Sequence, residues 1–228
     1  MNKQATILTR QIFLFGFVIL VLQSCVSVRD RSIKEWEKYE WQIVKVDKSQ
    51  NPTWKIYKRK LKGTNFLEYK IEGDVKSSSE ACLKAFKKNI DKLANDAENK
   101  KYPTYEISEE SENSILTYVI HNEPFFFKNT EMSVRYLFFS DEDGGFGARW
   151  NEAWEESQIQ PSKKLKRVDT FRGSWSFSQI TNNSSKAINS VQFDPKGMPL
   201  WLINPMVYRF LKEGLEGIRT TSKQILIR

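Results

Sequence analysis

Acid–base chemistry in this chain would fall to His121 and Glu123, which stand two positions apart. A histidine changes charge near neutral pH, and side chains at this spacing on a strand point to the same side, so the pair could exchange a proton. His121 is the only histidine, and no cysteine or histidine spacing of a zinc site occurs. No Gly-x-Ser-x-Gly elbow, nucleotide-binding loop or dinucleotide fingerprint is present either. We therefore predict no enzymatic activity, no metal and no cofactor, with an enzyme that uses His121 and Glu123 as the alternative.

Cys25 is a candidate for covalent modification because of the residues that precede it. Lys3 and Arg10 lead into an apolar run over residues 12–22, and the segment ends at Leu22-Gln23-Ser24-Cys25. The run is about 11 residues long, whereas a helix needs roughly 20 to span a bilayer, so it predicts an export signal and not a membrane span. The Leu-x-Ser-Cys ending resembles the lipobox of bacterial lipoproteins. This resemblance implies that Cys25 carries acyl chains.

This interpretation divides the chain into three parts. Residues 1–24 are expected to be a signal peptide, residues 25–34 a lipidated N-terminus and tether, and residues 35–228 one folded domain. The protein would then be exported and held by its lipid at the periplasmic side of the bacterial cell envelope. An ordinary signal peptide that leaves Cys25 unmodified is the alternative.

The composition predicts a folded protein whose partners are not nucleic acids. Of the 228 residues, 39% are hydrophobic and 13% are aromatic, which is enough to bury a core. The formal net charge of +8 is spread along the chain, and no basic stripe with interleaved aromatic residues stands out, so an anionic membrane surface is a better partner than nucleic acid. If Cys25 is acylated, Cys82 has no cysteine partner, and packing alone must stabilise the fold.

The predicted secondary structure consists of many strands and two longer helices. Alternation of apolar and polar residues predicts strands near 41–46, 54–59, 66–71, 104–107, 115–121, 132–140, 148–155, 166–171, 174–180 and 187–193. Asp143-Gly144-Gly145 is typical of a hairpin turn. Ser77 and Glu80 form a capping-box pair and predict an amphipathic helix over 77–97. A second helix is predicted over 199–219, where a proline takes the first position.

The last helix decides the expected fold class. Its first half is apolar almost all round, so other elements must cover it on several sides. The short connections between the predicted strands favour antiparallel neighbours in one large sheet. We therefore predict an α+β fold of the helix-grip type. In it, a curved antiparallel sheet wraps around the long C-terminal helix, and the second amphipathic helix follows the third strand.

A resemblance to a known family begins at residues 193–204, Phe-Asp-Pro-Lys-Gly-Met-Pro-Leu-Trp-Leu-Ile-Asn, which resemble the Asp-Pro-Gly-Gly-x-x-Pro-x-Trp-Leu-Val-Asn motif of START domains. Glu123-Pro124-Phe125-Phe126 is similar to the family's Pro-Trp-Pro corner, and Arg172-Gly173-Ser174-Trp175 to its Arg-x-x-x-x-Trp strand pair. Two departures are Thr130, where most members have an arginine, and the missing glycine at Lys196-Gly197. The resemblance implies a hydrophobic tunnel that binds one lipid, sterol or similar apolar molecule.

The candidates for the ligand site are one arginine and five aromatic residues. In some START members, the strand that corresponds to residues 132–140 of this chain carries an arginine that points into the tunnel. The resemblance therefore implies a head-group contact for Arg135, allowing a shift of one residue in register, with an arginine at a sheet edge as the alternative. Four aromatic residues on predicted strands are expected to line the tunnel or to pack in the core: Tyr118, Trp150, Trp154 and Trp175. Trp201 begins the last helix, and we expect it to act as a lid or as a membrane anchor.

Three functions are compatible with these observations. The first is a membrane-tethered carrier of an apolar molecule, and the second is a cyclase- or hydrolase-like enzyme such as the wider helix-grip superfamily contains. The third is a protein-interaction module whose tunnel has closed. The predicted anchor favours the carrier, because a tethered domain can collect its ligand from the leaflet that holds it.

Overall fold

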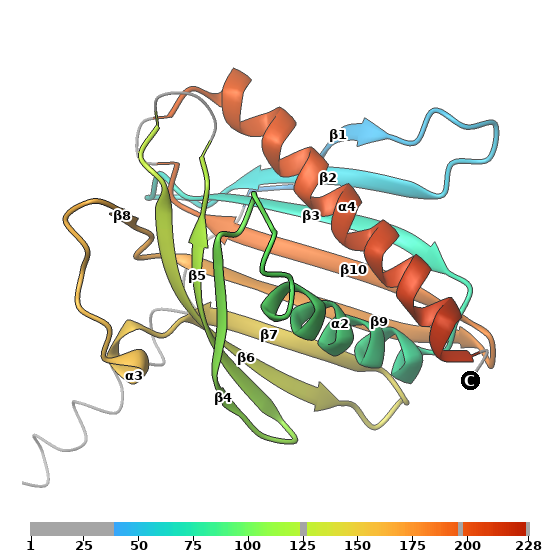
Figure 1. Cartoon of the computed structure of the whole chain (residues 1–228). Helices are drawn as coiled ribbons and strands as arrows, with labels where there is room; N and C mark the ends of the chain where they lie inside the picture. The colour runs from blue at the N-terminus through green and yellow to red at the C-terminus, as the bar shows by residue number, and fades with distance from the viewer. Residues whose placement is uncertain (1–38, 124–126, 196–197, 227–228) are drawn as a thin grey trace, which may run out of the picture. The chain divides into compact units, whose positions relative to one another are not determined.

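The computed structural model describes residues 39–123, 127–195 and 198–226 (Figure 1). The predicted signal peptide, Cys25 and the tether lie outside the described residues. Contacts divide the chain into two units: residues 1–39 with 61–63, and residues 40–60 with 64–228. The larger unit contains all the secondary structure discussed below. No helix in the described ranges is long and apolar enough to cross a membrane.

One curved sheet carries the fold. The strands that the structure describes are β1 (Gln42–Val46), β2 (Trp54–Lys60), β3 (Leu67–Val75), β4 (Thr104–Glu110), β5 (Ser114–His121), β6 (Thr130–Ser140), β7 (Phe146–Glu152), β8 (Lys166–Arg167), β9 (Phe171–Thr181) and β10 (Ser184–Phe193). Their order is β1-β2-β3-β10-β9-β7-β6-β5-β4, with antiparallel pairing throughout, and the short β8 adds a parallel pair with β6. The pairing of β10 with β3 joins the first strands of the chain to the last ones.

The sequence pattern predicts most of these strands correctly. In β3 the apolar side chains Leu67, Tyr69 and Ile71 are buried and the residues between them are partly exposed, as the alternation predicts. The hairpin turn between β6 and β7 is also confirmed, since Gly144 has a φ of 75°, a conformation that glycine adopts without steric cost. The strand predicted near 148–155 is wrong at its end, because Trp154 begins the short helix α3 (Trp154–Ser157).

Helix α2 (Ser79–Ala94) lies within the predicted range of 77–97, and its N-cap is one residue later than predicted. The side chain of Ser78 caps it by accepting a hydrogen bond from the backbone N–H of Ala81. Ser77 is not the cap, because its hydroxyl is buried and donates to Ser222 at 2.9 Å. The start of α2 is therefore fixed by the last helix as well as by its own sequence.

Helix α4 (Leu200–Leu226) crosses one face of the sheet, and α2 packs against it on the same face (Figure 1). Contacts of α4 with β3 and β10, and of α2 with β7 and β9, place both helices over the middle of the sheet. Gly73 allows the close approach of α4 to β3, since a Cβ there would stand 2.6 Å from Cδ2 of Leu215. The predicted helix-grip arrangement of sheet and C-terminal helix is confirmed.

Candidate ligand-binding cavity

A cavity of about 190 Å³ lies between the sheet and the two long helices. Its wall is almost entirely apolar or aromatic: Phe86, Asn89, Ile90, Leu93, Tyr102, Tyr105, Val119, Met132, Val134, Tyr136, Trp150, Phe171, Trp175, Asn189, Phe210, Gly214 and Ile218. These residues come from α2, β4, β5, β6, β7, β9, β10 and α4, with Tyr102 from the segment before β4. None of them carries a charge, so the wall favours an uncharged, apolar occupant.

Strand alternation and register bring the sheet side of the wall together. Met132, Val134 and Tyr136 are every second residue of β6, so they share the face that the helices cover. Antiparallel pairing then places Val119 of β5 opposite Met132, and Trp150 of β7 opposite Tyr136. Side chains that lie far apart in the sequence therefore meet in one layer.

Phe86 closes the helix side of this layer and is the centre of an aromatic cluster. Its ring centroid lies 5.8 Å from that of Tyr136, 6.3 Å from that of Trp150 and 6.5 Å from that of Trp175. Aromatic pairs at these separations attract one another beyond their burial of apolar area. The cluster gives the cavity an aromatic wall on the side of β6, β7 and β9.

The polar groups in the wall stay uncharged. The hydroxyls of Tyr105 and Tyr136 share a hydrogen bond, and burial raises the pKa of Tyr136 to about 12 and the pKa of Tyr105 well above its ordinary value. Oδ1 of Asn89 accepts a hydrogen bond from Oγ1 of Thr221 at 2.7 Å. These phenols and this amide therefore add polarity to the wall without adding charge.

Two of the six predicted ligand residues line the cavity. Trp150 and Trp175 are 5% and 3% exposed and stand in its wall. Sequence reasoning missed Asn189, which also lines it. The signal was present, because Asn189 lies between Ala187 and Val191 on the buried face of β10, where an asparagine is unusual.

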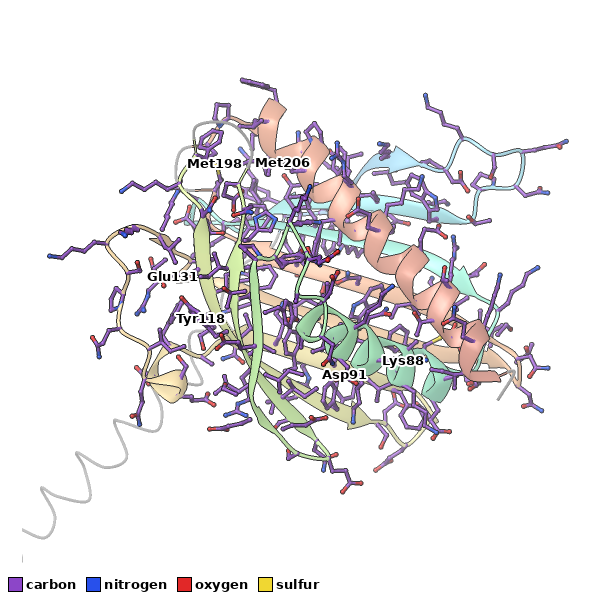
Figure 2. All side chains as sticks on the ribbon, viewed as in Figure 1. Lys88, Asp91, Tyr118, Glu131, Met198 and Met206 are labelled. Carbon is purple, nitrogen blue, oxygen red and sulfur yellow. The ribbon has the colours of Figure 1, made fainter. Side chains whose placement is uncertain are left out.

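Three other predicted residues lie elsewhere. Tyr118 projects from the face of β5 opposite to the cavity. Its hydroxyl donates a hydrogen bond to Oε2 of the buried Glu131 at 3.1 Å (Figure 2). The indole N–H of Trp154 donates to the carbonyl of Val168 at 2.9 Å, on the segment that follows α3. Trp201 is 75% exposed near the start of α4.

Arg135 also lies outside the cavity wall, which corrects its expected contact with a ligand head group. It stands between Val134 and Tyr136 on β6, so its side chain leaves from the opposite face. There Nη2 lies 2.6 Å from Oε2 of Glu109, and Nε lies 2.7 Å from Oε2 of Glu156. The two carboxylates neutralise the guanidinium without any ligand.

His121 and Glu123 contact each other, as their spacing predicts, but neither lines the cavity. Nδ1 of His121 lies 2.9 Å from Oε1 of Glu123, which also accepts a hydrogen bond from Oγ1 of Thr130 at 2.8 Å. Burial alone would raise the pKa of Glu123, yet the hydrogen bonds from His121 and Thr130 outweigh it and lower that pKa. Among the described residues, no three potential ligands gather into a metal site.

Comparisons with known proteins place the fold but not the ligand. No family model matches the chain, and no curated protein matches its sequence. A STAR-related lipid transfer protein from Xanthomonas axonopodis matches in structure with a TM-score of 0.63 at 16% identity, over 80% of this chain and 98% of that one. Human StAR-related lipid transfer protein 5 matches with a TM-score of 0.63 at 10% identity, over 92% and 98% of the two chains. Human STARD10 matches with a TM-score of 0.62 at 14% identity, over 86% and 78%. The described structure therefore has the helix-grip fold of these START domains.

Proposed function

We propose that this protein binds one uncharged apolar molecule in the cavity between its sheet and the helices α2 and α4. The observation that carries the proposal is the composition of the cavity wall. Its lining residues come from the sheet and from both long helices, and none of them is charged. A concave, mostly apolar wall with a few polar groups is the usual form of a site for an apolar ligand. The likeness to lipid transfer domains supports the same class of ligand.

The cavity volume limits what the described conformation can hold. A dry apolar cavity of about 150 Å³ accommodates a benzene molecule, whereas sites for drug-sized ligands have roughly 300–1,000 Å³. The cavity of about 190 Å³ therefore suits a ligand of one or two rings or a short acyl chain. A larger lipid would require α2 or α4 to move away from the sheet.

We also propose that the protein works at a membrane as a carrier. Leu200 and Trp201 are 40% and 75% exposed at the start of α4, which is an unfavourable place for two large apolar side chains in water. A tryptophan at this place suits the boundary between lipid and water. An acylated Cys25 on an exported chain would hold the domain close to that boundary.

We propose no catalytic step. His121 and Glu123 are hydrogen-bonded to each other outside the cavity wall, so a ligand in the cavity does not meet them directly. The protein-interaction alternative remains an outcome of the binding test below, because a protein with that function would stay empty.

Native mass spectrometry of the purified chain, followed by extraction and identification of the bound molecule, tests the binding proposal. We expect one apolar molecule per chain. The variant Gly214→Leu should lose it, because Gly214 lines the cavity, whereas Arg209→Leu should keep it, because Arg209 is exposed on the same helix. A wild-type chain that is empty, and stays empty when offered mixed lipids and sterols, would contradict the proposal.

Membrane attachment has a separate test. Fractionation of cells that express the chain should place the wild-type protein with the membranes, and Cys25→Ala should release it or leave the signal peptide uncut. A processed Cys25→Ala variant that remains fully bound to the membrane would show that acylation is not the anchor.

A further inference from the structure

Two buried polar atoms of residues that line the cavity have no hydrogen-bond partner among the residues that the structure describes. They are Nε1 of Trp150 and Oδ1 of Asn189. The two residues are 5% and 2% exposed, so bulk solvent does not reach them. Buried polar atoms without a partner are costly and rare in folded proteins, and those that occur often mark a functional site. Both atoms belong to residues that line the same cavity.

The neighbouring polar groups make the contrast clear. Tyr105 and Tyr136 share a hydrogen bond, and Asn89 accepts one from Thr221, so these side chains of the wall satisfy one another or their neighbours. The indole N–H of Trp150 is a donor only, and Oδ1 of Asn189 is an acceptor only. A partner for both would have to accept one hydrogen bond and donate another.

The sheet register places the two residues on one face, two strands apart. Trp150 of β7 pairs with Gly173 of β9, and Asn189 of β10 pairs with Trp175, two residues farther along β9. From strand spacing and rise, their Cα atoms are about 12 Å apart. A Cβ at Gly173 would overlap the six-membered ring of Trp150, so the indole lies over this glycine. The indole therefore leans from β7 over β9, the strand that lies between Trp150 and Asn189.

We propose that the ligand is an uncharged molecule of one or two rings with a hydroxyl group, which accepts a hydrogen bond from Trp150 and donates one to Asn189. This inference rests on the proposed function of the cavity. A hydroxyl is the smallest uncharged group that can do both. A carboxylate accepts but does not donate, and the charge of a carboxylate or a phosphate would be desolvated against a wall without charged side chains. A hydrocarbon would leave both protein atoms unpaired.

Isothermal titration calorimetry of the full chain with four matched probes tests the proposal. 2-Naphthol can accept and donate, 2-methoxynaphthalene can only accept, naphthalene can do neither, and 2-naphthoate carries a charge. One hydrogen bond between neutral groups corresponds to about a fivefold change in affinity. We therefore expect 2-naphthol to bind about fivefold more tightly than 2-methoxynaphthalene, and 2-naphthoate to show no binding.

Variants assign this preference to the two atoms. Asn189→Leu removes the acceptor. The variant should therefore bind 2-naphthol and 2-methoxynaphthalene with about the same affinity, in place of the fivefold preference. Trp150→Phe removes the donor and should weaken both of these probes relative to naphthalene. Arg209→Leu is the control, because Arg209 is exposed on α4 and is not among the residues that line the cavity. It should leave the ratios between the probes unchanged.

Thermal unfolding of the ligand-free chain separates binding from a structural role. Asn189→Leu should raise the midpoint of unfolding, because it removes a buried carbonyl without a partner. A lower midpoint would mean that Asn189 has a structural partner, and it would overturn the proposal. Equal binding of naphthalene and 2-naphthol, unaffected by the variants, would overturn the hydroxyl while leaving the cavity's function intact. Failure of every probe, naphthalene included, would overturn both the hydroxyl proposal and the proposed function.

Discussion

Replacing Gly214 with alanine should stabilise the ligand-free protein by about 1 kcal/mol. The residue lies inside α4, where glycine is less favourable than alanine by about 0.8–1.0 kcal/mol. An alanine Cβ would stand 3.5 Å from Nδ2 of Asn189 and 3.5 Å from Cζ2 of Trp175, which is ordinary van der Waals contact. Because no neighbour has to move, the helix propensity difference should appear almost in full.

Thermal and urea unfolding measure this effect. For a domain of 150–250 residues, 1 kcal/mol corresponds to a rise of about 2–4 °C in the unfolding midpoint. Gly217→Ala is the matched control on the same helix. A Cβ there would stand 3.3 Å from Nδ2 of Asn89, so part of the propensity gain should be lost to the tighter contact. The midpoint should therefore rise less in Gly217→Ala than in Gly214→Ala.

The two glycine variants should also differ in ligand binding. Gly214 lines the cavity, so its added methyl group should weaken a two-ring probe, whereas Gly217 is not part of the wall. A loss of stability of about 1 kcal/mol or more in Gly214→Ala would refute the reasoning. It would mean that α4 approaches the sheet more closely than the described distances allow, and that the glycine is there for close packing.

Three further predictions follow from the contacts described above. Gly73→Ala should destabilise the fold by about 1–3 kcal/mol in urea unfolding, because its Cβ would meet Leu215 at 2.6 Å; an unchanged midpoint would refute the close approach of α4. Arg135→Leu should leave the relative affinities for neutral and anionic ligands unchanged in titrations, because two carboxylates neutralise its guanidinium outside the cavity. A changed ratio of these affinities would show that Arg135 does act on the ligand. The pKa of Glu123 is lowered from 4.5 in the folded state, so its contribution to stability is present above about pH 4.5 and is lost as pH falls through the folded pKa. Acid unfolding should therefore be less steep in Glu123→Gln, and identical curves would contradict this assignment.

The fold was largely predictable because its strands alternate in burial and its helices are amphipathic. The pattern of β3 gave its buried face, and the composition of α4 required a cover on several sides. The errors fall where neighbouring elements compete with the local signal. Ser77 has the spacing of a helix cap, yet its hydroxyl donates a hydrogen bond to Ser222 of α4. Ser78 caps the helix in its place.

The candidate site was predictable only in part, because β6 is apolar on both faces. Periodicity showed that Tyr136 and Leu137 point to opposite sides, but it could not say which side the helices cover. In the structure Tyr136 lines the cavity and Leu137 is 50% exposed. The same choice of face brings Trp150 and Trp175 into the wall.

The sequence by itself determined the strand and helix periods, the amphipathic and apolar helices, and the absence of motifs for common catalytic sites. Only the tertiary structure decided that α2 and α4 cover one face of the sheet, and that Arg135 meets two carboxylates on the other face. Only the register of β7, β9 and β10 brought Trp150 and Asn189 to one wall, where Nε1 of the first and Oδ1 of the second have no partner among the described residues. The physical reason is range: periodicity and capping act within a few residues, whereas a cavity is formed by side chains that meet only when distant strands pair.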